Sequence, residues 1–201
     1  MYIIGITGGT GAGKSSAVKA VRALGAQALD CDEIYHELLS DNENMKNEIE
    51  EYFNNITVGG RIDRQRLSKI VWGDPASLQK LNTITHKYVN DEVEQRIASF
   101  KEQGVKTVAI DAIALIESGQ SKKCNTIVGI IATLEERVLR ITKRDKLTKE
   151  NALMRINAQQ PESFYRKNCN HILENNYDTQ EDFEIKCKEF FRELLKENNH
   201  E

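Results

Sequence analysis

The 201-residue sequence lacks the patterns of several large protein classes. Its four cysteines form no C-x-x-C and its four histidines no H-E-x-x-H, so a structural zinc site is unsupported and reduced thiols are expected. No apolar run approaches the roughly 20 residues of a membrane span, and no basic flank marks a targeting segment at the start. With a net charge of −3, the chain has no general positive excess for nucleic acid or an anionic membrane. We therefore expect a cytoplasmic monomer that binds small molecules, and neither nucleic acid nor membrane.

The chain is short enough for one domain, 1–201, and its 39% hydrophobic residues suffice for a sizeable core. No internal repeat or low-complexity tract interrupts it. The organisation to be expected is therefore one domain with an insertion.

A phosphate-binding motif stands near the start of the sequence. Gly8–Ser15 fits G-x-x-x-x-G-K-[ST] and follows the apolar run Tyr2–Ile6, which predicts a strand, a phosphate loop and a helix. Glycines let the loop bring successive N–H groups to phosphate oxygens, and the helix N-terminus adds its positive dipole end. Lys14 is expected to reach the β- and γ-phosphates, and Ser15 to offer its hydroxyl to Mg²⁺. The residues expected to bind ATP in this segment are Gly11, Ala12, Gly13, Lys14, Ser15 and Ser16.

Strand and helix patterns alternate along the rest of the chain. The pattern predicts an α/β fold, a doubly wound parallel five-stranded sheet, whose ligands gather at the carboxyl ends of the strands. The expected strands are residues 2–6, 26–30, 105–110, 126–132 and 171–175. We expect a core of about 1–36, 104–133 and 168–201, a helical acceptor-binding insertion of about 37–103, and a helical lid of about 134–167. Positive charge gathers in the lid segment, against the net charge of the chain.

Three acids follow expected strands and are candidates for metal binding or proton transfer. Asp30 and Asp32 close the second strand and Asp111 closes the third. On extended backbone, Asp30 and Asp32 would face one site. Phosphoryl transfer to an alcohol uses one carboxylate at Mg²⁺ and another that orients the hydroxyl and accepts its proton. Helix capping by Asp30 or Asp32 is the alternative, and which of the three acids contacts the metal stays open.

Over nearly its whole length, the chain resembles the dephospho-coenzyme A kinase family. The blocks that carry the resemblance are Ile6–Ser15, Leu29–His36, Ile62–Leu67, Val71–Pro75, Leu81–His86, Asp111–Leu115 with Glu117 and Gly119, and Arg140, Arg144–Asp145, Leu147 and Arg155–Gln159. The resemblance implies transfer of the γ-phosphoryl group of ATP to the ribose 3′-hydroxyl of dephospho-coenzyme A, the last step of coenzyme A biosynthesis.

The resemblance also implies roles for individual residues. The catalytic residues are Lys14, Asp32, Arg140 and Arg144, and Asn175 lies in the ATP site. The acceptor-binding residues are Asp32, Arg64, His86, Leu115 and Glu117, and the Mg²⁺ ligands are Ser15 and Asp111. The arginines would close as a lid whose planar guanidinium groups bind phosphate oxygens and whose closure excludes water.

The sequence departs from the family pattern at several positions. The segment Ile113–Glu117 replaces a more usual Pro-Leu-Leu-Phe-Glu, Lys87 replaces proline, and Arg137 replaces a frequent glutamine. Cys169–His171 also differs before the last strand. Arg137 and Lys149 are interpreted as part of a solvated helix face.

Two other functions remain compatible with the sequence. Another P-loop kinase, acting on a nucleoside, nucleotide or small alcohol, would share the loop, the carboxylate and the arginine lid. A nucleotide-hydrolysing switch module would turn over ATP or GTP without an acceptor. The blocks within 62–86 favour the coenzyme A precursor.

Overall fold

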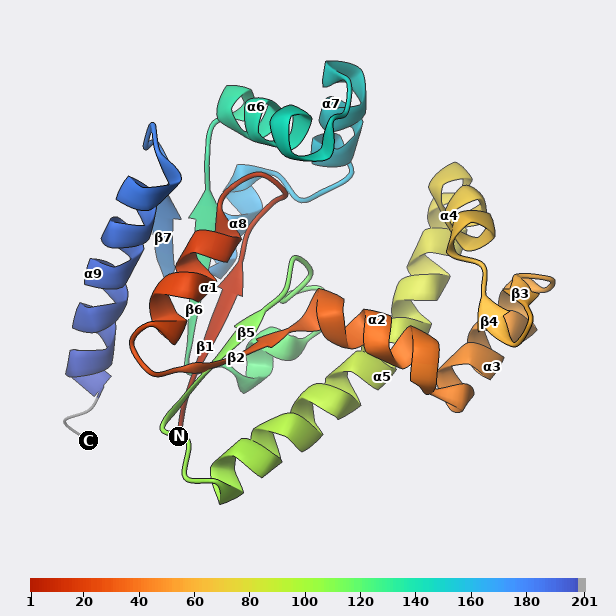
Figure 1. The fold of residues 1–201 in the computed structure, drawn as a ribbon, viewed down its shortest axis with the longest axis horizontal. Helices are drawn as coiled ribbons and strands as arrows, with labels where there is room; N and C mark the ends of the chain where they lie inside the picture. The colour runs from red at the N-terminus through yellow and green to blue at the C-terminus, as the bar shows by residue number, and fades with distance from the viewer. Residues whose placement is uncertain (199–201) are drawn as a thin grey trace. The chain divides into compact units, whose positions relative to one another are not determined.

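A five-stranded parallel sheet organises the phosphate-loop part of the protein (Figure 1). The computed structural model describes residues 1–198, without the side chains of residues 72 and 73. The strands are β1 (Tyr2–Thr7), β2 (Gln27–Asp30), β5 (Thr107–Asp111), β6 (Thr126–Ile131) and β7 (His171–Glu174). Their order is β2-β5-β1-β6-β7, so β1 is central and the chain winds outward in both directions. The predicted doubly wound parallel fold is confirmed.

Along β1, successive side chains point to opposite faces of the sheet, and the two faces are packed differently. Ile4 and Ile6 are fully buried in a core that includes residues of α1 (Lys14–Arg22) and α9 (Gln180–Asn198). These two helices pack side by side (Figure 1). Gly5 faces the other side, where a Cβ atom would come within 2.6 Å of Leu115. The 3-10 helix η1 (Gln120–Lys123) also contacts β1 on that side.

Residues 30–100 form a second compact unit with its own core, while residues 1–29 and 101–201 form the first. The elements of the second unit are α2 (Cys31–Asp41), α3 (Glu43–Phe53), the hairpin β3 (Thr57–Val58) and β4 (Arg61–Ile62), α4 (Arg64–Gly73) and α5 (Pro75–Glu102). The compact unit begins at Asp30, before the expected boundary at 37. The reason is that α2 packs on α3 and β4 and contributes Leu39 to their shared core.

The backbone at Asp30 and Asp32 differs from the expected one. Asp30 is the N-cap of α2, and its Oδ1 accepts hydrogen bonds from the N–H groups of Asp32 (2.9 Å) and Glu33 (3.1 Å). Asp32 therefore lies in the first helical turn, and the argument that both acids share one extended face is wrong. The carboxylate of Asp30 accepts bonds from N–H groups that the helix leaves unpaired, so the helix begins at Cys31.

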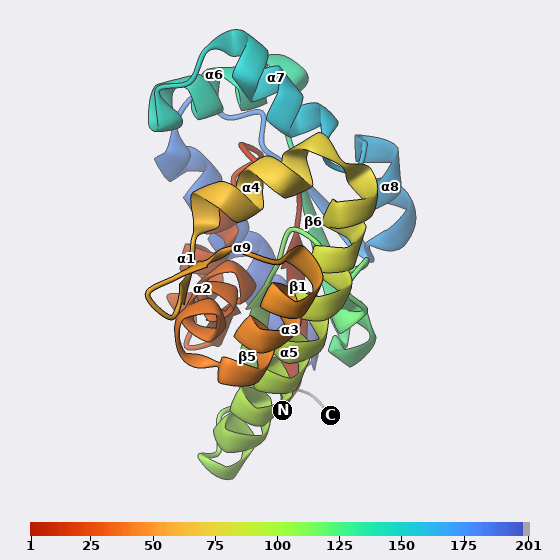
Figure 2. The same cartoon turned by 90° about the vertical axis from the view of Figure 1, so that its right-hand side faces the viewer.

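Two short helices follow β6 and stand beyond the strand end, within the segment that was expected to form a lid (Figures 1 and 2). They are α6 (Leu134–Asp145) and α7 (Lys149–Asn157), which pack together through a small apolar cluster. A capping box between Thr133 and Glu136 starts α6. The next helix, α8 (Glu162–Asn168), was expected within the lid but packs on β6 and β7. Among the described residues, no helix is long and apolar enough to cross a membrane.

We predict that Gly8→Ala destabilises the protein by about 3 kcal/mol or more, because strain and a clash add. Gly8 has a φ of 147°, and a Cβ there would lie 2.2 Å from the carbonyl oxygen of Ile130, a backbone atom of β6. The matched control is Gly104→Ala, at a φ of 75° with no atom near its Cβ position. That variant should lose only about 1 to 2 kcal/mol. Urea unfolding measures both, and equal losses would contradict the close approach of the loop to β6.

Candidate active site

The phosphate loop connects β1 to α1 and exposes main-chain N–H groups at the start of the helix. Gly13 is the N-cap, with a φ of 110° and no side chain to bond the first-turn amides. Gly11 also has a positive φ, 81°, and a Cβ there would come within 2.8 Å of the carbonyl oxygen of Arg137. Free amides at a helix N-terminus suit an anion. The loop therefore has the local geometry expected of a phosphate cradle.

Lys14 and Asp111 form an ion pair beside this loop. Lys14 Nζ lies 2.9 Å from Asp111 Oδ1, and the two side chains are only 14% and 12% exposed. The pair forms because β1 and β5 are neighbours in register, with Ile6 opposite Asp111. The structure thus brings together the predicted phosphate-binding lysine and one predicted metal ligand.

The serines of the first turn of α1 differ in exposure. Ser15 is exposed, so its hydroxyl is accessible from solvent, whereas Ser16 is 3% exposed and belongs to the buried side of the helix. Only the backbone N–H of Ser16 has a natural role in an anion site, and it bonds the carbonyl of Gly13 at 3.1 Å. Ser15 is the better-placed hydroxyl for a metal ligand.

Asn175, which follows the edge strand β7, holds the loop. Its Nδ2 donates to the carbonyl oxygen of Ala12 at 2.9 Å, and its own carbonyl oxygen accepts from Arg140 at 3.2 Å. The side chain is buried, and its Oδ1 has no hydrogen-bond partner in the described part of the protein. This residue follows β7, so the predicted ATP-binding role is compatible with its position beside the loop.

The lid arginines have different surroundings. Arg140 donates to the carbonyl oxygen of Gly11 at 3.3 Å, so it contacts the loop directly. Arg144 is 63% exposed and donates through Nε and Nη2 to Asp145, at 2.7 and 3.1 Å. Arg155 donates to the same carboxylate at 2.8 Å. The hydrogen bond from Arg144 is the main cause that lowers the pKa of Asp145, and Arg155 adds to it.

Two further residues at the loop were not identified from sequence. Arg137 was interpreted as a solvated position, but it is half-buried, and its Nε donates to the carbonyl oxygen of Thr10 at 3.0 Å. Gln159 accepts from Thr10 N at 2.8 Å. The signal available in the sequence was the position of Arg137 one helical turn before Arg140.

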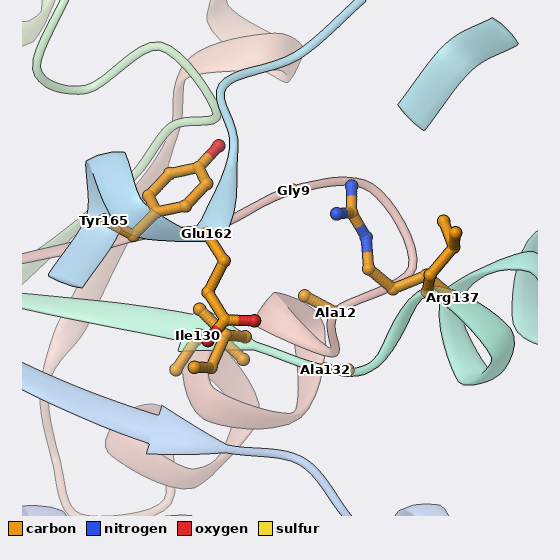
Figure 3. Close-up of a pocket in the computed structure, with 9 residues that line it drawn as sticks. Gly9, Ala12, Ile130, Ala132, Arg137, Glu162 and Tyr165 are labelled. Carbon is orange, nitrogen blue, oxygen red and sulfur yellow. The ribbon is translucent and has the colours of Figure 1, made fainter. Parts of the chain in front are cut away.

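A small cavity of about 170 Å³ lies behind the loop, between β6, α6 and α8 (Figure 3). Gly9 and Arg137 form part of its wall, together with Glu162 and Tyr165 of α8. Burial is the main cause that raises the pKa of Tyr165 to about 12, and Glu117 adds to this effect. At neutral pH the Tyr165 hydroxyl is therefore a protonated, neutral group.

The predicted acceptor residues lie in both units. In the second unit, Asp32 and Arg64 are exposed at the first turns of α2 and α4, and His86 is partly buried on α5. In the first unit, Glu117 is exposed after β5, while Leu115 is 0% exposed. The Leu115 side chain packs in the interior against β1 and offers no surface to an acceptor, which argues against its predicted contact.

Comparison with known proteins gives one consistent family. The family model described as dephospho-CoA kinase matches residues 2–181. A dephospho-CoA kinase of Lactobacillus johnsonii is 33% identical over 195 residues, 96% of this chain and 98% of that protein. One from Thermus thermophilus is 33% identical over 192 residues, covering 96% and 91%.

Solved structures share the fold of this chain. A crystal structure from Thermus thermophilus has a TM-score of 0.79 at 33% identity, covering 96% of this chain and 97% of that one. The fold is also shared with a dephospho-CoA kinase from Campylobacter jejuni, at a TM-score of 0.69, 24% identity and 98% coverage of both chains. Shikimate kinase from Acinetobacter baumannii has a TM-score of 0.56 at 19% identity, covering 98% and 94%.

We predict that Lys14→Met lowers kcat/KM for phosphoryl transfer by roughly 10² to 10³, the scale for losing one transition-state charge contact. The variant should also lose about 1 to 3 kcal/mol of stability, because Asp111 stays largely buried without its lysine. Steady-state kinetics and urea unfolding measure the two effects.

The matched control is Lys19→Met on the same helix, whose side chain is 70% exposed in a pair with Glu184. It should change both quantities little. The double variant Lys14→Met with Asp111→Asn should regain stability but not activity. Near-normal turnover in a folded Lys14→Met protein would remove Lys14 from the mechanism.

Proposed function

The chain belongs to the dephospho-coenzyme A kinase family, and we propose that it transfers the γ-phosphoryl group of ATP to the ribose 3′-hydroxyl of dephospho-coenzyme A. The products are coenzyme A and ADP, so the reaction is the final step of coenzyme A biosynthesis. The observation that carries the proposal is a family match over residues 2–181 combined with a phosphate loop whose Lys14 lies against Asp111.

The donor binds along the phosphate loop in this proposal. The main-chain N–H groups of Gly11–Ser16 receive phosphate oxygens, and Lys14 neutralises negative charge near the transferred group. Asn175, beside Gly13 and Ala12, completes the ATP site. The loop is already held by Asn175 and Arg140, so little reorganisation is needed when ATP binds.

The residues present fit a magnesium ion, which the family implies. Ser15 offers an exposed hydroxyl and Asp111 a carboxylate, both oxygen donors of the kind that Mg²⁺ takes. Magnesium is commonly held by one or two carboxylates together with substrate phosphates and waters, so this small donor set is sufficient. When bound, the ion would neutralise charge on the phosphate oxygens.

The acceptor is oriented by residues that the family pattern places before, within and after the insertion. Asp32 orients the 3′-hydroxyl and accepts its proton, a role suited to an exposed carboxylate. Arg64, His86 and Glu117 bind other parts of the acceptor. These assignments rest on the matching blocks of sequence and on the exposure of Asp32, Arg64 and Glu117.

Arg140 and Arg144 bind phosphate oxygens from the lid. They lie one turn apart on α6, and Arg140 already contacts the loop. Arg144 exchanges its bond to Asp145 for a phosphate, because the planar guanidinium group can grip two oxygens of either partner. Closure of the lid over the bound phosphates also excludes water from the transferred group.

The proposal also covers the compartment, the oligomeric state and the partners of the protein. We propose a cytoplasmic monomer with ATP and dephospho-coenzyme A as its small-molecule partners. No disulfide joins any of the four cysteines, all of which lie in the described part of the chain, as reducing compartments favour. Sedimentation velocity tests the monomer, and a concentration-dependent dimer would contradict it.

A coupled ADP-release assay tests the function. ADP release should require dephospho-coenzyme A, and the product should carry a new 3′-phosphate by mass spectrometry. Adenosine, nucleoside monophosphates, pantetheine and shikimate serve as control acceptors. Comparable ADP release without any acceptor would favour a hydrolytic switch, and preference for a control acceptor would favour another P-loop kinase.

We predict that Asp32→Asn lowers kcat by roughly 10² or more while ATP affinity changes little, because the substitution keeps the shape but removes basicity. Asp30→Asn is the matched control, since asparagine caps a helix about as well as aspartate. Activity is measured across a Mg²⁺ titration, alongside thermal unfolding. Wild-type turnover in Asp32→Asn would contradict the role of Asp32 as the base. Recovery of kcat on addition of Mg²⁺ would instead show that Asp32 organises the metal.

We predict that Arg144→Lys lowers kcat more than it weakens ATP binding, because lysine keeps the charge but loses the planar two-point grip. Arg166→Lys is the control, an arginine on α8 that bonds Glu162 and Glu174. Single-turnover kinetics and nucleotide titration separate the two quantities. Weaker binding with unchanged kcat would show that Arg144 acts on the ground state.

A further inference from the structure

Arg137 is a half-buried cation without an ionic partner among residues 1–198. Its Nε donates to the carbonyl oxygen of Thr10 at 3.0 Å, and its Nη2 donates to Gln159 Oε1 at 3.0 Å. Both acceptors are neutral oxygens. Glu162, which lines the same cavity, is bonded instead to Arg166 at 2.7 Å. Burial lowers the pKa of the Arg137 guanidinium, but the group remains a strong base and stays charged.

The carbonyl oxygen of Gln159 occupies a position where two donors of the loop region converge. It accepts from the main-chain N–H of Thr10 at 2.8 Å as well as from Arg137 at 3.0 Å. The same amide group donates through Nε2 to Thr10 Oγ1 at 2.6 Å. A main-chain N–H and a guanidinium that meet at one oxygen are the donors that bind a phosphate oxygen.

The Arg137 side chain lies directly on the phosphate loop. A Cβ at Gly9 would come within 2.3 Å of Arg137 Nη2 and 3.0 Å of Gln159 Oε1, so only a glycine leaves room for this arrangement. Figure 3 shows the Arg137 guanidinium group extending from the start of α6 toward the part of the loop that contains Gly9. Arg140, less than one turn further along α6, contacts the loop at Gly11.

We propose that Arg137 and the Thr10 N–H form an additional binding position for a phosphate oxygen of the donor nucleotide, and that Gln159 is an internal competitor for it. The proposal rests on the proposed function, since it names a further residue of the same donor site. Binding of ATP exchanges the neutral Gln159 oxygen for a charged one. The exchange is favourable because a phosphate oxygen adds the attraction of opposite charges to the hydrogen bond from the Arg137 guanidinium, which the neutral amide oxygen of Gln159 does not.

This arrangement predicts opposite effects for two residues that touch each other. Removing the cation removes a phosphate contact, so Arg137→Gln should raise the ATP dissociation constant by about tenfold or more, the scale for hydrogen bonds to charged groups. Gln159→Met keeps the length of the side chain but removes the competing oxygen, so it should lower the constant by about threefold to tenfold, the net scale for a typical intramolecular hydrogen bond. Gln159→Glu puts a carboxylate beside Arg137 and should raise the constant.

Isothermal titration of the full chain with ATP and Mg²⁺, without acceptor, measures these constants. Thermal unfolding verifies that each variant is folded. Lys143→Gln is the matched control, because it removes one positive charge from an exposed position of the same helix. Its ATP affinity should stay within about twofold of the wild type, as for an exposed charge.

Opposite shifts for Arg137→Gln and Gln159→Met would support the proposal. Weaker binding in both variants, or no change in either, would overturn it, because the contacts would then only brace the loop. The titration needs no acceptor, so its outcome is independent of the ADP-release assay. A wild-type protein that fails to phosphorylate dephospho-coenzyme A would refute the proposed function and leave this donor-site test standing.

Discussion

The close approach of other backbone and side-chain groups to the phosphate loop is the constraint on which the site depends. The carbonyl oxygen of Ile130 lies against Gly8, Arg137 lies on Gly9, and Asn175 lies on Gly13. A side chain at Gly8 would collide with the backbone of β6, so the loop can approach that strand only because Gly8 has none, whereas at Gly9 and Gly13 a Cβ would displace the ends of the Arg137 and Asn175 side chains. A loop held in this way presents its amides with little ordering left to occur on binding.

The positive groups around the phosphate loop are held by partners that a phosphate can replace. The donor site contains several positive groups, and in the described structure Lys14 is paired with Asp111 and Arg144 with Asp145. Arg137 instead bonds only neutral oxygens. Pairing with Asp111 keeps the largely buried charge of Lys14 from destabilising the fold, and exchange of this carboxylate for phosphate oxygens keeps the cost of the buried charge low on binding. The electrostatics of the site are therefore arranged as exchangeable contacts around the loop.

The two compact units divide the proposed chemistry. Residues 1–29 and 101–201 contain the sheet, the phosphate loop and the lid arginines, and residues 30–100 contain Asp32, Arg64 and His86 on helices with a separate apolar core. Phosphoryl transfer depends mainly on positioning and on charge stabilisation. A division of this kind lets the donor site keep the geometry common to P-loop kinases while a different set of helices defines the acceptor.

The sequence by itself determined the phosphate loop and the five strands, because these depend on local turn chemistry and apolar pattern. It also identified Asp111 as a strand-end carboxylate. At Asp30, the structure selected the helix cap from the two alternatives that the local sequence allowed. Only the tertiary structure decided that Leu115 is interior and that Arg137 bonds Thr10. These facts depend on contacts between residues far apart in the chain, and the pattern within one segment carries no record of which distant group packs against it.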